Sequence, residues 1–214
     1  TKRWWDYQFR DEQGVPEAEY LEELDRLFRQ AVNRQVHADV EVGTYLSGGI
    51  DSGAVTCLTA RAHPNVKSFT GGFDLSSASG LELGFDERAK AEQLSAACKT
   101  EHYQVVLKAG DMERVLPELV WHLEDLRVGQ SYPNYYVSRL ASRFVKVVLA
   151  GTGGDEIFAG YPWRYYRAVR NDDAAQYLDK YYAYWQRLIP DAHRAAFFRP
   201  AVACCNRNKL VYQI

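Results

Sequence analysis

The sequence has no apolar run long enough to cross a bilayer and no large excess of charge of either sign. Its 214 residues carry 26 Lys and Arg against 28 Asp and Glu, a net charge of -2. Without a basic field, nucleic acid is not an expected partner. Without about 20 consecutive apolar residues, a membrane span is not expected. Residues 1–10 lack a signal-peptide pattern. We therefore expect a soluble, cytoplasmic globular protein.

Cysteine is scarce, and neither cysteine nor histidine has the spacing of a metal site. The four cysteines include no Cys-x-x-Cys, and the adjacent pair Cys204–Cys205 is poorly suited to tetrahedral zinc. No two of His63, His102 and His122 have metal-ligand spacing. In a cytosolic protein, thiols of this kind are expected to be reduced and structural.

Two common nucleotide-binding motifs are also missing. The sequence has no G-x-x-x-x-G-K-[ST], which excludes a Walker-type loop that holds phosphates with a lysine. It also has no G-x-G-x-x-G after its first expected strand, which argues against a dinucleotide site.

The most informative stretch that is present is residues 46–52, Leu-Ser-Gly-Gly-Ile-Asp-Ser. It stands between an apolar run and a segment of helical periodicity. Glycine permits positive φ and close approach of the backbone to a ligand, and the free N–H groups at a helix start favour an anion. Ser47 and Ser52 add hydroxyl donors, and Asp51 adds a carboxylate for a divalent cation. The alternative is an ordinary strand-to-helix turn.

Apolar spacing predicts alternating strands and helices along most of the chain. Alternation of this kind favours right-handed crossovers and an open parallel sheet flanked by helices, an α/β fold. The expected strands are 40–46, 66–73, 101–107 and 144–149. The expected helices are 16–36, 53–62, 87–97, 111–121, 134–143 and 174–188. Residues 74–86, rich in Ser, Gly and Asp, are expected to form a loop near the site.

A second glycine-rich turn, residues 150–160, follows the last expected strand. Two such turns at the carboxyl ends of parallel strands are expected to face one crevice. Asp51 and Asp155 could then share a Mg²⁺ ion that bridges the phosphates of a nucleotide and neutralises a leaving pyrophosphate. The alternative for Asp155 is a helix N-cap.

These two turns resemble the signatures of the asparagine synthetase family. Residues 45–52 look like the pyrophosphatase loop of N-type ATP pyrophosphatases, and residues 149–161 are similar to the second signature of asparagine synthetases. Segments 68–73, 85–94 and 138–141 fit the family in order and spacing. The resemblance implies an adenine nucleotide alpha hydrolase type of fold and an ATP-dependent ligase. Such a ligase adenylates a carboxylate, aspartate in the favoured case, for attack by ammonia from a glutaminase domain.

Carried over residue by residue, the resemblance implies roles for both loops. ATP and Mg²⁺ are the implied cofactors, and Asp51 and Asp155 are the implied metal ligands. Glu124 and Thr152 are the candidates for the catalytic part, although Glu124 could equally be a solvated acid in a connecting segment. The nucleotide-binding candidates are Leu46, Ser47, Gly48, Gly49, Asp51, Ser52, Gly71, Gly151 and Gly153.

The sequence departs from the family pattern in three places. Thr152 stands where the family has an acid, and threonine does not accept a proton near neutral pH. The pyrophosphate-stabilising lysine of the family is not recognisable after Tyr165, and no glutaminase domain precedes the loop. We therefore expect a portion of a longer protein: an entry segment 1–14, a synthetase domain 15–165 and a helical extension 166–214. A β-lactam-synthetase-like enzyme and a non-catalytic nucleotide-binding module remain alternatives, and a homodimer remains open.

Overall fold

The computed structural model describes residues 2–6, 8, 14–77, 84, 86–124, 131–162, 174–185 and 192–193. The chain divides into two compact units, residues 1–152 and residues 153–214, which are described separately. The proposed domain limits at residues 14 and 165 stay a prediction. In the described residues, no helix is long and apolar enough to cross a membrane.

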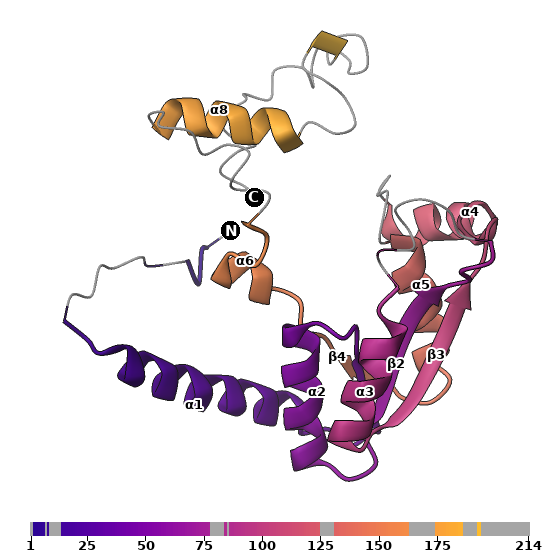
Figure 1. Cartoon of the computed structure of the whole chain (residues 1–214), viewed down its shortest axis with the longest axis horizontal. Helices are drawn as coiled ribbons and strands as arrows, with labels where there is room; N and C mark the ends of the chain where they lie inside the picture. Colours follow the sequence, from indigo (N-terminus) through magenta and orange to yellow (C-terminus); the bar gives the residue numbers. More distant parts are fainter. Residues whose placement is uncertain are drawn as a thin grey trace. The chain divides into compact units, whose positions relative to one another are not determined.

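The first unit is built on a four-stranded parallel sheet (Figure 1). Its strands are β1 (Val42–Tyr45), β2 (Lys67–Phe73), β3 (Glu101–Leu107) and β4 (Val147–Leu149), in the order β3-β2-β1-β4. Thr44 of β1 is in register with Ser68 of β2 on one side and with Leu149 of β4 on the other. The predicted open parallel sheet is confirmed.

Helices join the strands and cover both faces of this sheet, as parallel connections require (Figure 1). A core on one face joins Val32, Val36, Val55 and Leu149, and a second core joins Phe69, Val137, Ala141 and Val145. The helices of the first unit are α1 (Glu17–Gln35), α2 (Ile50–Ala62), α3 (Arg88–Cys98), α4 (Asp111–Leu123) and α5 (Ser131–Ala141).

The predicted elements are present, and the three largest differences in their boundaries are shifts of three residues, at the starts of α2, α5 and β4. Helix α2 begins at Ile50 rather than at residue 53, so Asp51 and Ser52 lie in its first turn. Helix α5 begins three residues earlier than expected, with Pro133 in its first turn, where the missing N–H of proline costs no helical bond. Strand β4 is shorter than expected, because the N–H groups of Phe144 and Val145 both bond to Ala141 O in a turn that ends α5.

The expectation of reduced thiols is wrong for one pair of cysteines. Cys57 of α2 and Cys98 of α3 form a disulfide, with their Cα atoms 5.1 Å apart. The two residues are separated by 41 positions in the sequence. They meet because α2 and α3 pack side by side, an arrangement that cysteine spacing does not reveal. Cys204 and Cys205 lie outside the described residues.

The described part of the second unit contains α6 (Gly154–Phe158) and α8 (Ala174–Trp185). The predicted helix 174–188 is thus present over residues 174–185. Within α8, the rings of Tyr177 and Tyr181 stack with centroids 5.9 Å apart. Lys209 and the rest of residues 194–214 lie outside the described residues.

A buried polar cluster joins the beginnings of β2 and β3. The hydroxyl of Ser68, a fully buried side chain, lies 2.8 Å from Thr100 Oγ1 and 2.8 Å from His102 Nδ1. The other ring nitrogen of His102 is buried and has no hydrogen-bond partner. Burial lowers the pKa of His102, and the charge of Glu92 partly opposes this effect. The neutral imidazole is therefore the form that suits the fold.

We expect the folded state to lose stability as the pH falls below about 6.5, the ordinary pKa of histidine. The folded pKa is the lower one, so the unfolded chain takes up the proton first and protonation favours unfolding. Urea unfolding between pH 5 and 8 measures this slope. His102→Gln should flatten it, whereas His122→Gln, at a side chain 62% exposed, should leave it unchanged. An unchanged slope in His102→Gln would contradict the assignment.

Candidate functional site

The strand order places a topological switch point between β1 and β4. From β1 the chain moves outward to β2 and β3, and it then returns to β4 on the other side of β1. In open parallel sheets, ligands bind at such a point, beyond the carboxyl ends of the strands. The first glycine-rich loop follows β1 and the second follows β4. Both loops therefore leave the sheet at the position where a ligand site is expected.

The first loop, residues 46–52, is fixed to the sheet at its beginning. Leu46 is buried, and its N–H donates to Phe69 O at 2.9 Å. The hydroxyl of Thr70 donates to Leu46 O. These two bonds join the end of β1 to β2, so the backbone of the loop starts from a rigid position.

The glycines then turn the backbone into α2. Gly48 has a φ of +81°, a conformation that favours glycine. Gly49 is the N-cap of α2 and provides no side-chain cap. The N–H groups in the first turn of a helix have no intrahelical acceptor, and the helix dipole adds positive potential there. This geometry suits a phosphate group.

The two serines of the loop bond to each other rather than pointing apart. Ser47 Oγ lies 3.0 Å from Ser52 Oγ, and the Ser47 N–H donates to Ser52 Oγ at 3.1 Å. Ser52 Oγ also lies 3.2 Å from Gly49 O, to which it donates. Ser52 is buried, whereas Ser47 is exposed. The exposed hydroxyl of Ser47 is thus held at the mouth of the loop.

The second loop packs directly against the first. A Cβ atom placed on Gly151 would lie 2.6 Å from both Asp51 C and Ser52 N, and 3.0 Å from Asp51 Cβ. Only a residue without a side chain allows this approach between two backbones. Gly151 of the second turn and Asp51 and Ser52 of the first, which are far apart in the sequence, therefore form one surface within the first unit.

The first turn of α3 forms another side of the first loop, and the list of candidate residues did not include it. A Cβ on Gly48 would lie 2.6 Å from Lys90 Cβ and 3.4 Å from Glu87 O. Burial raises the pKa of Glu87 in this turn, and the charge of Lys90 and the Ser47 hydroxyl partly oppose this effect. The sequence feature that could have pointed to this turn is the pair of acidic residues 86–87 directly before a predicted helix.

Asp86 and Arg88 fasten this turn to the end of β2. Arg88 forms a salt bridge of 2.7 Å with Asp86 and donates to Phe73 O at 2.8 Å. Hydrogen bonds from Arg88 lower the pKa of Asp86. Gly72 leaves space for the Arg88 side chain. Residues 78–83 and 85 of the predicted loop lie outside the described residues.

The other candidates lie at separate places. Gly71 is in β2, where a Cβ would lie 2.8 Å from Val137 Cγ2 of α5. Thr152 is exposed, next to Gly151. Glu124 is exposed at the end of α4 with a φ of +51°, and residues 125–130 after it lie outside the described part of the chain.

Asp155 and Gly153 belong to the second unit. Gly153, with a φ of +108°, is the N-cap of α6, so the alternative that Asp155 is the N-cap is wrong. Asp155 lies in the first turn, and Gly160 leaves space for its carboxylate. The proposed sharing of a metal between Asp51 and Asp155 stays a prediction.

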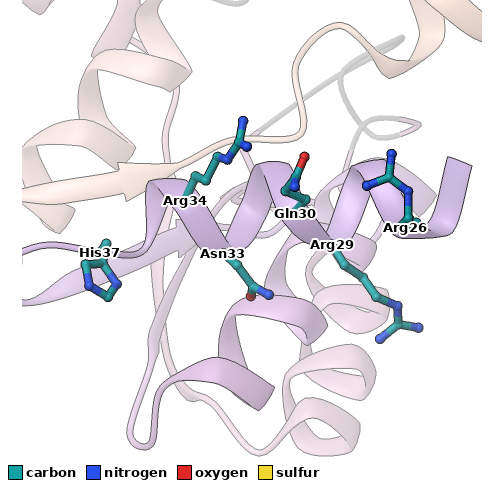
Figure 2. A pocket seen from close by; sticks show the side chains of 6 residues that line it. All are labelled: Arg26, Arg29, Gln30, Asn33, Arg34 and His37. Carbon is teal, nitrogen blue, oxygen red and sulfur yellow. The ribbon is translucent and has the colours of Figure 1, made fainter. Parts of the chain in front are cut away.

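No preformed metal cage is present in the described residues, where no three His, Cys, Asp or Glu side chains gather. A shallow hollow lies along α1, and its side chains point in different directions rather than toward one centre (Figure 2). No residue of either glycine-rich loop lines it. The lining residues are Arg26, Arg29, Gln30, Asn33, Arg34 and His37.

Two solved structures show distant similarity. The NH3-dependent NAD synthetase of Campylobacter jejuni, in complex with nitrate, matches with a TM-score of 0.41 and 17% identity, covering 65% of this chain and 60% of that one. The NMN synthetase of Francisella tularensis matches with a TM-score of 0.41 and 15% identity, covering 72% and 68%. Neither similarity bears on the function of this chain.

Two relatives found by sequence have higher sequence identity to this chain than these two structures. The glutamine-hydrolyzing asparagine synthetase 1 of Bacillus subtilis is 34% identical over 146 residues, which are 68% of this chain and 22% of that protein. The glutamine-hydrolyzing asparagine synthetase 2 of Lotus japonicus is 31% identical over 184 residues, 82% of this chain and 30% of that protein. The chain thus spans less than a third of either relative.

A family model described as asparagine synthase matches residues 23–210, which include both glycine-rich loops and the first turn of α3. The match covers far more than half of the 214 residues. The chain therefore belongs to the asparagine synthase family.

Proposed function

We propose that this chain is the ATP-using portion of an amide-forming ligase that adenylates a substrate carboxylate. The observation that carries the proposal is the contact of Gly151 with the Asp51–Ser52 peptide at the switch point of the sheet. This contact supports a single nucleotide site made from both loops. Membership of the family supports the class of reaction, and the name of the Bacillus subtilis relative supports aspartate as the carboxylate.

In the proposed reaction, a carboxylate oxygen attacks the α-phosphorus of ATP. The bond from the α-phosphorus to the bridging oxygen breaks, and pyrophosphate leaves with the electron pair. Ammonia, delivered by a glutaminase domain, then attacks the acyl carbon and releases AMP. The amides of residues 50–52, in the first turn of α2, and the Ser47 hydroxyl would bind the phosphate oxygens that become pyrophosphate.

Asp51 fits the role of a magnesium ligand. Its carboxylate is half-buried in the first turn of α2, beside the amides that suit phosphate. Magnesium is commonly held by one or two carboxylates together with phosphate oxygens and water, so a complete protein cage is not needed. Bound Mg²⁺ would neutralise charge on the leaving pyrophosphate. Asp155 would be the second carboxylate.

Thr152 and Glu124 are proposed for the catalytic part. The Thr152 hydroxyl, exposed beside Gly151, can donate to a phosphate or substrate oxygen but cannot act as a general base near neutral pH. Glu124 would contact the substrate. Because threonine cannot be a general base, Thr152 favours a second candidate function. In this alternative the chain is a nucleotide-binding module that binds ATP but catalyses no reaction.

Pyrophosphate release with ATP, Mg²⁺, ammonium and a panel of carboxylates tests the proposal on the full 214-residue chain. We expect release with aspartate and a roughly tenfold weaker magnesium-dependent ATP affinity in Asp51→Asn, about 1.4 kcal/mol. Asp39→Asn, at an exposed residue ahead of β1, is the control with the same charge change. ATP binding without release would favour the non-catalytic module, and no ATP binding would contradict both functions.

A further inference from the structure

The disulfide of Cys57 with Cys98 lies at a surface hollow where α2 and α3 end. Both cysteines line this hollow, which has a volume of about 610 Å³, and both are only half-buried. The hollow is made from the last turns of the two helices and the residues that follow them, whereas the phosphate-binding loop precedes α2. A small molecule can therefore reach the sulfur atoms from a site of their own, without unfolding of the chain.

The side chains around this disulfide make the hollow positively charged. Arg61, in the last turn of α2, and Lys99, at the end of α3, both line it and are both exposed. In the described part of the chain, neither forms a salt bridge. None of the described residues that line the hollow is acidic. A small molecule that carries a carboxylate is therefore attracted toward the sulfur atoms.

Lys99 has a backbone conformation that favours glycine. It is the C-cap of α3, with a φ of +57° in the left-handed region. Glycine is the usual residue where a helix ends in this way, because a side chain is disfavoured there. Lysine at this position costs conformational energy, and a function for its charge beside Cys98 explains why it is there.

We propose that Cys57 and Cys98 form a thiol–disulfide exchange site for small anionic thiols. The thiolate of one reagent molecule bonds to one protein sulfur, the S–S bond breaks, and its electron pair leaves on the other sulfur. A second reagent thiolate attacks the reagent sulfur of this mixed disulfide and releases the first cysteine. The two cysteine thiolates take up the protons that the two reagent thiols lost, so the protein disulfide is reduced and the reagent is oxidised to its own disulfide. Arg61 and Lys99 attract the reagent and stabilise the leaving thiolate.

The packing of α2 on α3 allows this exchange to occur on a folded chain. A Cβ on Gly48, just before α2, would lie 2.6 Å from Lys90 Cβ, and a Cβ on Gly53 would lie 3.2 Å from Leu94 Cδ1. The disulfide is a third contact, further along the same two helices. The other two contacts do not depend on the S–S bond, so they hold the helices together when it opens.

Reduction of the full chain by mercaptoacetate and by cysteamine, at low salt and the same pH, tests the assignment. Mercaptoacetate carries a carboxylate beside its thiolate, whereas the ammonium group of cysteamine cancels the charge of its thiolate. Iodoacetamide stops the reaction, and mass spectrometry of the peptides counts free Cys57 and Cys98 separately from the other cysteines. When Arg61→Gln is combined with Lys99→Gln, we expect the rate with mercaptoacetate to fall about tenfold and the rate with cysteamine to fall less than about threefold. Comparison of each reagent with itself cancels the different reactivities of the two thiols.

Two control variants separate the charge of the hollow from other effects. Lys108→Gln removes the same charge from an exposed residue after β3 that does not line the hollow, and it should leave both rates unchanged. Lys99→Arg keeps the charge and should be reduced by mercaptoacetate as fast as wild type. Added salt should remove most of the difference between wild type and the double variant, because it screens exposed charges.

Three outcomes would overturn the assignment. A fall by the same factor with both reagents would show that the cations do not select the charge of the thiol. Lower stability in urea with both rates unchanged would leave Arg61 and Lys99 only the role of opposing the helix dipoles. The third outcome is a chain, purified without reductant, that lacks the bond between Cys57 and Cys98 or in which the bond is reduced only after unfolding.

Discussion

Gly151→Ala is expected to lower ATP affinity by at least roughly 100-fold, or about 2.7 kcal/mol. The new methyl carbon would lie 2.6 Å from Asp51 C and Ser52 N. Both are backbone atoms in the first turn of α2, so they cannot rotate away as the end of a side chain could. To remove this steric overlap, the second loop must move away from the first, or α2 must shift against the sheet. Either movement separates the two halves of the proposed nucleotide site.

Gly84→Ala is a matched control for this substitution. Apart from its two chain neighbours, nothing lies within 4 Å of a Cβ atom at Gly84, so the same change of residue type should leave ATP affinity unchanged. Calorimetric titration with Mg–ATP measures the affinity, and urea unfolding shows whether each variant is folded. A folded Gly151→Ala chain with wild-type affinity would show that the contact between the loops is not needed for binding.

The contact of Gly151 with the first loop follows from a feature that the sequence could predict. Strands and helices alternate with clear apolar spacing, and parallel strands place their carboxyl ends at one edge. The two glycine-rich turns could therefore be assigned to one crevice before their contact was known. Spacing alone did not show that the contact is between backbones, which explains the need for glycine at residue 151.

The start of α2 was harder to predict for a physical reason. Apolar periodicity reports the apolar side chains that a helix buries in the core, and the first of these in α2 is Val55. Ile50, in the preceding turn, is 90% exposed. The first turn contacts the second loop and suits a ligand rather than the core, so it carries no periodic signal. The same turn contains Asp51 and Ser52, the residues of greatest functional interest.

Local sequence patterns could not predict the contacts between segments that are distant in the sequence. Lys90, in the first turn of α3, lies against Gly48 of the first loop although the two residues are far apart in the sequence, because α3 packs beside α2. The disulfide of Cys57 with Cys98 has the same origin. Neither pairing has a sequence spacing that distinguishes it from many others, because spacing reports neighbours on one helix or strand.

Phe69→Ala is expected to lower the free energy of unfolding by about 3–5 kcal/mol, which is a large part of the 5–15 kcal/mol typical of a domain. The Phe69 side chain is 1% exposed, and its ring lies 5.8 Å from the Tyr103 centroid and 6.0 Å from that of Phe144. A Cβ on Gly43 would lie 2.7 Å from its Cε2 atom, so the strand beside it is shaped around the ring. Removal of the ring leaves a cavity between β2 and α5.

Urea unfolding measures this loss of stability. Leu75→Ala is the control, because the Leu75 side chain is 58% exposed. This control substitution should change the free energy of unfolding by less than about 0.5 kcal/mol. The backbone of residue 69 still accepts the Leu46 N–H in the folded variant, so the start of the phosphate-binding loop keeps its anchor. Folded Phe69→Ala should therefore bind ATP within about threefold of wild type, about 0.7 kcal/mol. A loss of affinity larger than the unfolded fraction explains would show that the core on the α5 face also sets the geometry of the loop. A loss of stability below about 1 kcal/mol would contradict the packing of this core.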